Sequence, residues 1–181
     1  MALVKGSFRI RKATARDLPL LVRHRRAMWE DFLDLPPSTL DKGDSVYRQW
    51  LRMRMRRGDA VAFISETSDR VPVASGAVFV RDIDPSPSGV ATSPHIISMF
   101  TQKEYRGQAI ATRILRELAS WCKKRGFPAV TLSPAPKARP LYRREGFERA
   151  WGMVLRFPNR RQRPHSRRQA HPRSPASRPS G

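Results

Sequence analysis

An apolar strand that leads through a short turn into an amphipathic helix is the most constraining feature of this sequence. The strand is HIISMFTQ (95–102), and the turn contains Arg106 and Gly107. In the helix that follows, apolar residues recur at the spacing of one helical face, and Gly126 provides its stop. The strand and this face need a common core, so we predict that the strand is central in a sheet. The apolar face comprises Ile110, Ile114, Leu118, Trp121 and Cys122.

Further strands and helices are predicted on both sides of this segment. Thr14 and Asp17 resemble a capping box for a helix that runs to about Phe32. After a loop, DLPPSTLDKGD, Asp44 is expected to cap a second helix that ends at Arg57. The order of elements predicts an α+β chain, a mixed sheet with helices packed on it. The other predicted strands are 8–14, 60–66, 71–82, 129–135 and a last pair within 147–157, and a short helix is predicted at 138–146.

Length and composition favour one domain followed by a tail. The chain has 181 residues, which suits a single core. Residues 158–181 are rich in Arg, Pro and Ser and lack apolar periodicity, so we expect a disordered basic tail after a domain at 1–157. No run approaches a membrane span or a signal-peptide core, and we expect a cytoplasmic protein. The single cysteine, Cys122, excludes an intrachain disulfide and an all-cysteine metal site.

The charge of the chain is extreme. The net formal charge is +21, and the tail contributes seven arginines and no acid. Residues 1–157 keep 29 basic against 15 acidic residues, a net +14. Such a surface attracts nucleic acid, acidic lipid, phosphorylated cofactors or acidic proteins, and charge alone does not choose among them. The tail is also a candidate for non-specific contact with polyanions.

The start of the 110–125 helix has the character of an anion site. A helix N-terminus presents unpaired N–H groups and partial positive charge. The small side chains of Ala109 and Ala111 would let a pyrophosphate approach the backbone, and Arg106 adds a charged donor. The P-loop pattern GxxxxGK[ST] and the dinucleotide pattern GxGxxG are both missing. The anion is therefore held differently from that of a P-loop ATPase or a dinucleotide dehydrogenase.

These residues resemble the acetyl-CoA-binding segment of the GNAT N-acetyltransferase superfamily, which places Arg/Gln-x-x-Gly-x-Gly/Ala between its fourth strand and third helix. The segment SMFTQKEYRG (98–107) resembles that fourth strand, and ARPLYRREGF (138–147) resembles the small-helix signature Ala-x-x-Leu-Tyr-x-x-x-Gly-Phe. The element order matches along residues 8–157. The resemblance implies a three-layer fold with a central, mixed, mostly antiparallel sheet flanked by helices. The motif here reads Arg106-Gly107-Gln108-Ala109-Ile110-Ala111.

The resemblance implies acetyl-CoA as cosubstrate and assigns the residues that bind it. The fourth strand would offer backbone groups to the pantetheine arm. Ala109 replaces the first glycine of the motif. Alanine suits helical dihedrals and keeps its N–H, so we expect binding to survive, although the added methyl could crowd the pyrophosphate. The implied cofactor-binding residues are Met99, Phe100, Thr101, Arg106, Gly107, Gln108, Ala109, Ile110, Ala111 and Thr112.

The resemblance also implies acetyl transfer to a primary amine by direct attack in a ternary complex. An amide of the fourth strand, that of Met99 or a neighbour, would polarise the thioester carbonyl. Tyr142 matches the tyrosine near the CoA sulfur and is the candidate general acid. His95 lies eleven residues before Arg106, at the spacing of a glutamate base in the histone-acetylating branch, and it titrates in the right range. Cys122 is expected in the core, since no covalent intermediate is needed.

The acceptor is not readable from the sequence. Glu30, Asp31 and Asp34 are candidates for lining its site, and Glu66 is a weaker candidate base. Basic surroundings favour a carboxylated amine or an acidic protein over a polycationic aminoglycoside.

Two alternatives stay open. Family members commonly carry Asn or Ser where this chain has Ala135, which together with Ala109 keeps open a degenerate, non-catalytic acyl-CoA-binding protein. The second alternative is a nucleic-acid-binding protein that uses its charge. A homodimer is also open.

Overall fold

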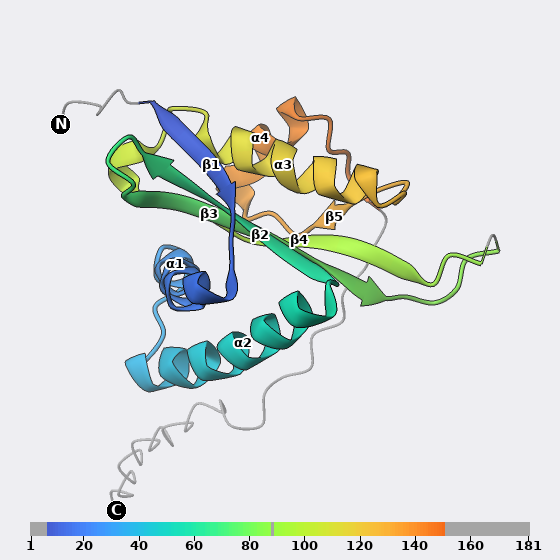
Figure 1. Ribbon diagram of the computed structural model, residues 1–181, viewed down its shortest axis with the longest axis horizontal. Helices are drawn as coiled ribbons and strands as arrows, with labels where there is room; N and C mark the ends of the chain where they lie inside the picture. Colours follow the sequence, from blue (N-terminus) through green and yellow to red (C-terminus); the bar gives the residue numbers. More distant parts are fainter. Residues whose placement is uncertain (1–6, 88, 151–181) are drawn as a thin grey trace, which may run out of the picture. The chain divides into compact units, whose positions relative to one another are not determined.

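A central sheet with helices on both faces forms the fold (Figure 1). The computed structural model describes residues 7–87 and 89–150. All helices and strands described here lie in the unit formed by residues 1–147. The strands are β1 (Phe8–Lys12), β2 (Ala60–Thr67), β3 (Pro72–Asp82), β4 (Thr92–Thr101) and β5 (Thr131–Leu132). The α-helices are α1 (Leu18–Glu30), α2 (Pro37–Arg57), α3 (Ile110–Lys124) and α4 (Arg139–Arg144), with 3-10 turns η1 (Ala15–Asp17), η2 (Lys103–Tyr105) and η3 (Pro136–Ala138).

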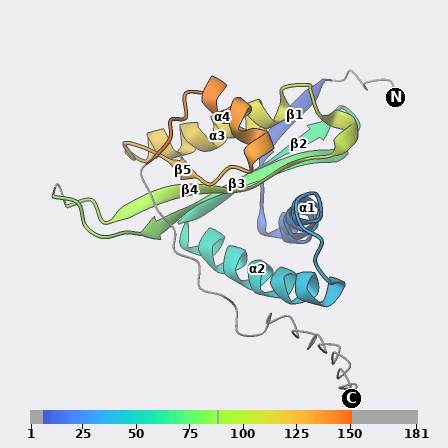
Figure 2. The same ribbon diagram turned by 180° about the vertical axis from the view of Figure 1, so that it is seen from behind.

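The sheet is mixed and mostly antiparallel, as predicted. Its strand order is β1-β2-β3-β4-β5, and only the β4–β5 pair is parallel. Helices α1 and α2 cover one face, and α3 and α4 cover the other, as Figures 1 and 2 both show. The three-layer α+β architecture is therefore confirmed.

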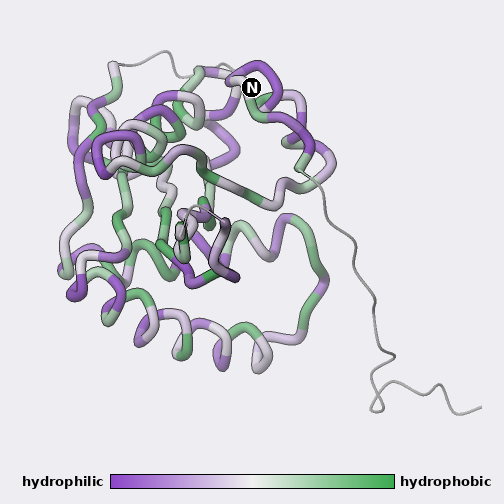
Figure 3. Tube along the Cα trace, turned by 90° about the vertical axis from the view of Figure 1, so that its right-hand side faces the viewer, coloured by the Kyte–Doolittle hydropathy of each residue, from purple (hydrophilic) through white to green (hydrophobic). Residues whose placement is uncertain are grey.

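Alternation along the strands builds a separate core on each face. In β2, Ala62 and Ile64 pack with the α1–α2 side, whereas Val61 packs with α3 on the opposite side. In α3, the predicted apolar face is buried except for Trp121, which is half-buried. Hydrophobic and hydrophilic residues alternate along the helices in Figure 3, as expected for elements that cover a sheet on one side.

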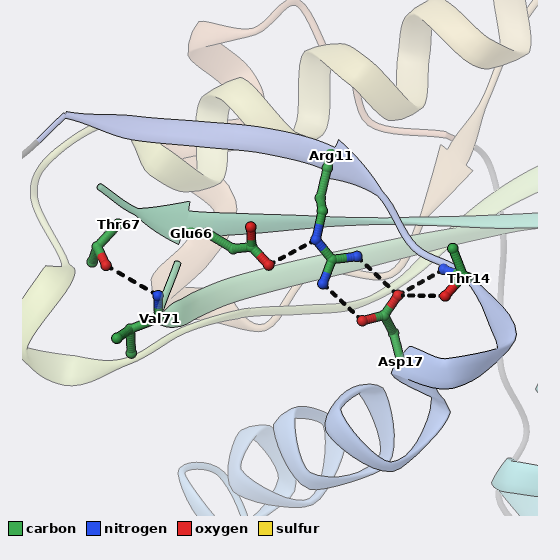
Figure 4. A network of polar contacts seen from close by, with 6 residues as sticks. All are labelled: Arg11, Thr14, Asp17, Glu66, Thr67 and Val71. Atoms are coloured by element: carbon green, nitrogen blue, oxygen red, sulfur yellow. Dashed lines mark hydrogen bonds and ion pairs between the residues drawn. The ribbon is translucent and has the colours of Figure 1, made fainter. Parts of the chain in front are cut away.

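A polar network fixes the start of α1 against the sheet edge (Figure 4). The Arg11 guanidinium of β1 donates to Glu66 of β2 and, through two nitrogens, to the Asp17 carboxylate before α1. Asp17 also accepts from the backbone N–H and hydroxyl of Thr14. Arg11 holds the pKa of Asp17 down, at about 2. The predicted pairing of Thr14 with Asp17 is confirmed. Glu66 takes part in this network by accepting a hydrogen bond from Arg11.

The predicted start of the second helix is wrong. Helix α2 begins at Pro37, and Asp44 lies inside it. Proline at the first helical position suits its fixed φ, and the Arg26 side chain of α1 binds the carboxylates of Asp41 and Asp44 across the helix pair. Gly43, which suggested a loop, lies within the helix, and a Cβ there would meet nothing within 4 Å. Gly58 ends the helix in the left-handed conformation, as predicted.

The C-terminal part of the domain is less regular than predicted. Strand β5 spans two residues, and 147–150 belong to no helix or strand. The rest of the predicted last strand pair and the predicted tail lie outside the described residues. No helix in the described ranges has the length and apolarity that a bilayer crossing requires.

Strand β4 contains a bulge near its C-terminal end. Ser75 of β3 pairs with Phe100, and Ala77 pairs with Ile97, so β4 holds one residue more than β3 between these pairs. Ser98 adopts a left-handed conformation there, with φ of 53°. The pairing with β5 ends at Ile96, and from 97 to 101 no strand of the described residues pairs with β4 on that edge. Beyond Ile96, at the bulge, β4 therefore separates from the segment that follows β5.

Helix α3 begins from a strained residue. Ala109 has φ of 56° and ψ of 15°, in the left-handed region, and its carbonyl accepts the first helical bond from the Arg113 N–H. The prediction that this alanine takes helical dihedrals is therefore wrong. A left-handed residue suits glycine, because a Cβ crowds the following carbonyl oxygen.

We expect Ala109→Gly to raise the free energy of unfolding by about 0.5–1 kcal/mol, because glycine relieves the left-handed strain. Ala119→Gly, at a right-handed position inside the same helix, should instead lower it by about 1 kcal/mol. Urea unfolding measures both changes, provided that the dependence of the unfolding free energy on urea concentration stays the same in the variants. A loss of stability in both variants would show that Ala109 is not strained.

Candidate active site

Two cavities meet at the opened part of the sheet. The first, of about 900 Å³, lies among α1, α2, the middle of β4 and the segment after β5. The second, of about 620 Å³, lies among the end of β4, the start of α3 and α4. They share Met28 of α1, Phe32 just after it, Met99 of β4, Ala138 of η3 and Tyr142 of α4. A ligand in one cavity would therefore meet a ligand in the other beside these residues, among which Met99 and Tyr142 come from the sheet and from α4.

Nearly all predicted cofactor-binding residues line the second cavity. Nine of the ten do so, and Gln108 is the exception. Its Nε2 is buried without a hydrogen-bond partner, as is the Thr101 hydroxyl on the cavity wall. Gly107 has φ of 80°, and a Cβ there would meet nothing within 4 Å. This wall thus combines open backbone at Gly107 with Thr101, whose hydroxyl has no partner among the described residues.

The charged groups around the second cavity are mostly paired. Arg106 donates through Nε to the Thr101 carbonyl and binds the Asp31 carboxylate of α1, which keeps the pKa of Asp31 low. Glu145 is bound by Arg116 of α3. Lys137 and Arg144 also line the cavity, and no described carboxylate pairs with either of them. The sequence reasoning missed these two cations, although Lys137 directly precedes the small-helix signature and Arg144 lies within it.

Tyr142 stands between the two cavities. The residue is 9% exposed, and its ring packs edge-on against Phe147. Burial raises the pKa of the phenol above its usual value of 10.0, so the hydroxyl keeps its proton at neutral pH. No described group hydrogen-bonds to this hydroxyl. The tyrosine is thus placed and protonated as a proton donor to either cavity.

His95 lies on the wall of the first cavity, on β4. Its Nδ1 lies 2.8 Å from the Thr131 hydroxyl, which itself donates to the Pro94 carbonyl at 3.2 Å. Because a hydroxyl has one proton, Thr131 accepts from Nδ1–H, and this tautomer leaves the lone pair on Nε2. Burial, with a smaller effect of Arg81, lowers the pKa of His95 below 6.5. At neutral pH the imidazole is therefore a neutral base.

The acidic residues predicted for the acceptor site lie outside the first cavity. Glu30 pairs with Arg26, and Asp34 is exposed and lines neither cavity. Asp31 lies on the wall of the second cavity, and Glu66 belongs to the β1–β2 network. Their roles in catalysis or acceptor binding stay predictions. Ala135, the departure noted in the sequence, lines the first cavity.

Cys122 is buried in the core, as predicted, and burial raises the pKa of its thiol to about 11. It lines neither cavity.

Aromatic and basic residues that sequence reasoning missed dominate the first cavity. Helices α1 and α2 supply them, and their spacing in the sequence is that of ordinary amphipathic helices. Only the packing of the two helices, fixed in part by the Arg26 bridge, brings them together. They are Arg25, Trp29, Lys42, Tyr47 and Trp50.

Comparison with solved structures gives the same fold. A GCN5-related N-acetyltransferase from Ralstonia eutropha JMP134 has a TM-score of 0.74 at 23% identity, covering 83% of this chain and 99% of that one. A predicted acetyltransferase from Clostridium acetobutylicum, solved with acetyl-CoA, has a TM-score of 0.72 at 25% identity, covering 82% and 96%. The aminoglycoside 6'-N-acetyltransferase AAC(6')-Ih from Acinetobacter baumannii has a TM-score of 0.64 at 16% identity, covering 84% of this chain and 99% of that one.

No curated protein matches the sequence closely enough to count as a relative. The model of the acetyltransferase (GNAT) family matches residues 24–147, a range that contains every residue lining the two cavities. The chain therefore belongs to the GNAT acetyltransferase family.

Proposed function

We propose that this protein is an N-acetyltransferase that moves the acetyl group of acetyl-CoA to a primary amine by direct attack in a ternary complex. The observation that carries the proposal is the meeting of two cavities at Met99 and Tyr142. The second cavity would take the cosubstrate and the first the amine, so that both reactants converge on one place. Family membership and the neighbour solved with acetyl-CoA support the choice of cosubstrate.

The residues around the second cavity fit a pantetheine pyrophosphate. The N-terminus of α3 offers N–H groups beside Gly107, and Lys137 and Arg144 add positive charge. The Thr101 hydroxyl is an unused polar group on the β4 side. Arg106 would bind an anion only by sharing or leaving Asp31, so cosubstrate binding competes with this ion pair.

The reacting groups can be assigned to named atoms. Nε2 of His95, directly or through water, would accept the proton of the ammonium, and the free amine would form the new C–N bond. The N–H of Met99, beside the bulge, would stabilise the negative charge on the carbonyl oxygen. As the C–S bond breaks, the Tyr142 hydroxyl would donate its proton to the thiolate, and the phenolate would regain a proton from the nitrogen of the new amide, which must lose one.

The first test is calorimetric titration of the full-length protein with acetyl-CoA at moderate salt. We expect saturable one-site binding that Arg106→Glu weakens at least about tenfold, because a negative charge then faces the pyrophosphate. Arg48→Glu, on the exposed part of α2, makes the same charge change away from both cavities and should bind normally. Absence of saturable binding would remove the transferase proposal and favour the polyanion alternative.

Tyr142→Phe should lower kcat about a hundredfold and leave the Kd of acetyl-CoA unchanged, because phenylalanine keeps the ring packing and loses the proton donor. Steady-state kinetics and the same titration separate the two effects. An unchanged kcat would take Tyr142 out of the mechanism.

The pH profile of kcat/KM should report His95. Since the lowered pKa keeps the base neutral, activity should hold from neutral pH down past 6.5 and fall only at lower pH. His95→Gln should be slow and lack this limb. The other buried histidine, His24, has a pKa of about 4 and lies outside both cavities. Persistence of the same limb in His95→Gln would assign the base to another group.

A further inference from the structure

The first cavity has positive and neutral walls. Its ionisable lining residues, within the described ranges, are Arg25, Lys42, His95 and the phenols of Tyr47 and Tyr142, and no carboxylate lines it. His95 is neutral at neutral pH. A polycationic amine would therefore enter against two positive charges with nothing to neutralise its own.

Arg25 is a half-buried cation of the first cavity that has no carboxylate partner among the described residues. Its guanidinium carbon lies 4.4 Å from the centre of the Tyr47 ring and 5.6 Å from that of Trp29. Its neighbour Arg26 takes the available acids instead, at distances of 3.2, 2.6 and 3.0 Å. These acids are Glu30, Asp41 and Asp44.

The aromatic rings hold this guanidinium in place. Tyr47 is 6% exposed and is fixed by its hydroxyl, which donates to the Ser98 Oγ at 3.2 Å. A stacked guanidinium leaves its planar fork of N–H donors free at the edge, and that fork matches a carboxylate. The cost of ordering the Arg25 side chain is thus met largely before any ligand binds.

Much of the remaining wall is apolar. It includes Met28, Trp29, Phe32, Val46 and Trp50. A volume of about 900 Å³ suffices for a small molecule with a ring or a branched apolar body. The cavity thus offers an anion-binding group, apolar surface, and contact with the second cavity at Met99 and Tyr142.

We propose that the acceptor is a primary amine that carries an apolar or aromatic body and a carboxylate, which Arg25 binds. The inference rests on the proposed acetyl transfer, and it names the acceptor class. The carboxylate would pair with the Arg25 fork, the body would pack on Trp29 and Trp50, and the amine would point to Met99 and Tyr142. Lys42, at the exposed start of α2, would add attraction without fixed geometry.

Matched amines test this directly on the full-length protein with saturating acetyl-CoA. The pairs are para-aminomethylbenzoate against benzylamine, and phenylalanine against phenethylamine, each differing only by a carboxylate. Spermidine serves as the polycation. We expect that, in at least one pair, kcat/KM for the amine with the carboxylate is about tenfold or more above kcat/KM for the amine without it. A charge-assisted hydrogen bond allows a difference of this size.

Arg25→Gln should abolish this preference by lowering kcat/KM for the carboxylate to about that for the uncharged amine. Arg23→Gln removes the same charge from an exposed position of α1 outside both cavities and should keep the preference. Equal use of both members of each pair, a preference for spermidine, or a preference that survives Arg25→Gln would overturn the inference.

Calorimetric binding of the same amines to the protein loaded with CoA separates this inference from the proposed function. Selective binding of a carboxylate without turnover would uphold the recognition of carboxylated amines by Arg25 and defeat the transferase proposal. Turnover without selectivity would do the reverse. Absence of selectivity in both binding and turnover would overturn the inference whether or not the protein is active.

Discussion

The left-handed backbone at Ser98 is the constraint on which the site depends. It inserts one residue into β4 after the strand has left β5, so the sheet opens while β3 still holds the other edge. Gly76 lies opposite, and a Cβ there would overlap the Met99 sulfur. Tyr47 reaches from α2 to the Ser98 hydroxyl. The position of Met99 between the cavities therefore follows from a bulge, a glycine and a buried phenol acting together.

Helix α1 links the two cavities from the other side. Arg25 faces the first cavity, while Asp31, just past its C-terminal end, holds Arg106 at the second. Arg26, between them in sequence, bridges to α2 and fixes the wall that the two helices share. A ligand that drew Arg106 away from Asp31 would free a carboxylate at the end of the helix that carries the acceptor wall. The proposed cosubstrate and acceptor sites thus both involve α1 and the residue just past its end.

The sequence predicted those parts that depend on local pattern. The apolar face of α3, the hairpin of β2 and β3, and the segment from Arg106 to Ala111 follow from periodicity, turn residues and a motif. The start of α2 was missed because Gly43 and two prolines read as a loop, and only the bridge from Arg26 reveals why the helix extends over them. The left-handed backbones of Ser98 and Ala109 leave no trace in hydropathy, because neither residue type demands that conformation. The acceptor wall was missed because it forms only when two helices pack.

The excess positive charge is distributed unevenly, because most carboxylates pair with particular arginines. The Asp17, Glu66, Asp44 and Glu145 carboxylates are each bound by an arginine that lines neither cavity, and Asp31 is bound by Arg106. Cations without carboxylate partners among the described residues then line both cavities: Lys137 and Arg144 in one, Arg25 and Lys42 in the other. A surface that only attracts polyanions would not require the cations without carboxylate partners to lie in the two cavities. Placing unpaired cations at both ends of one continuous site instead favours two small anionic reactants that meet between them.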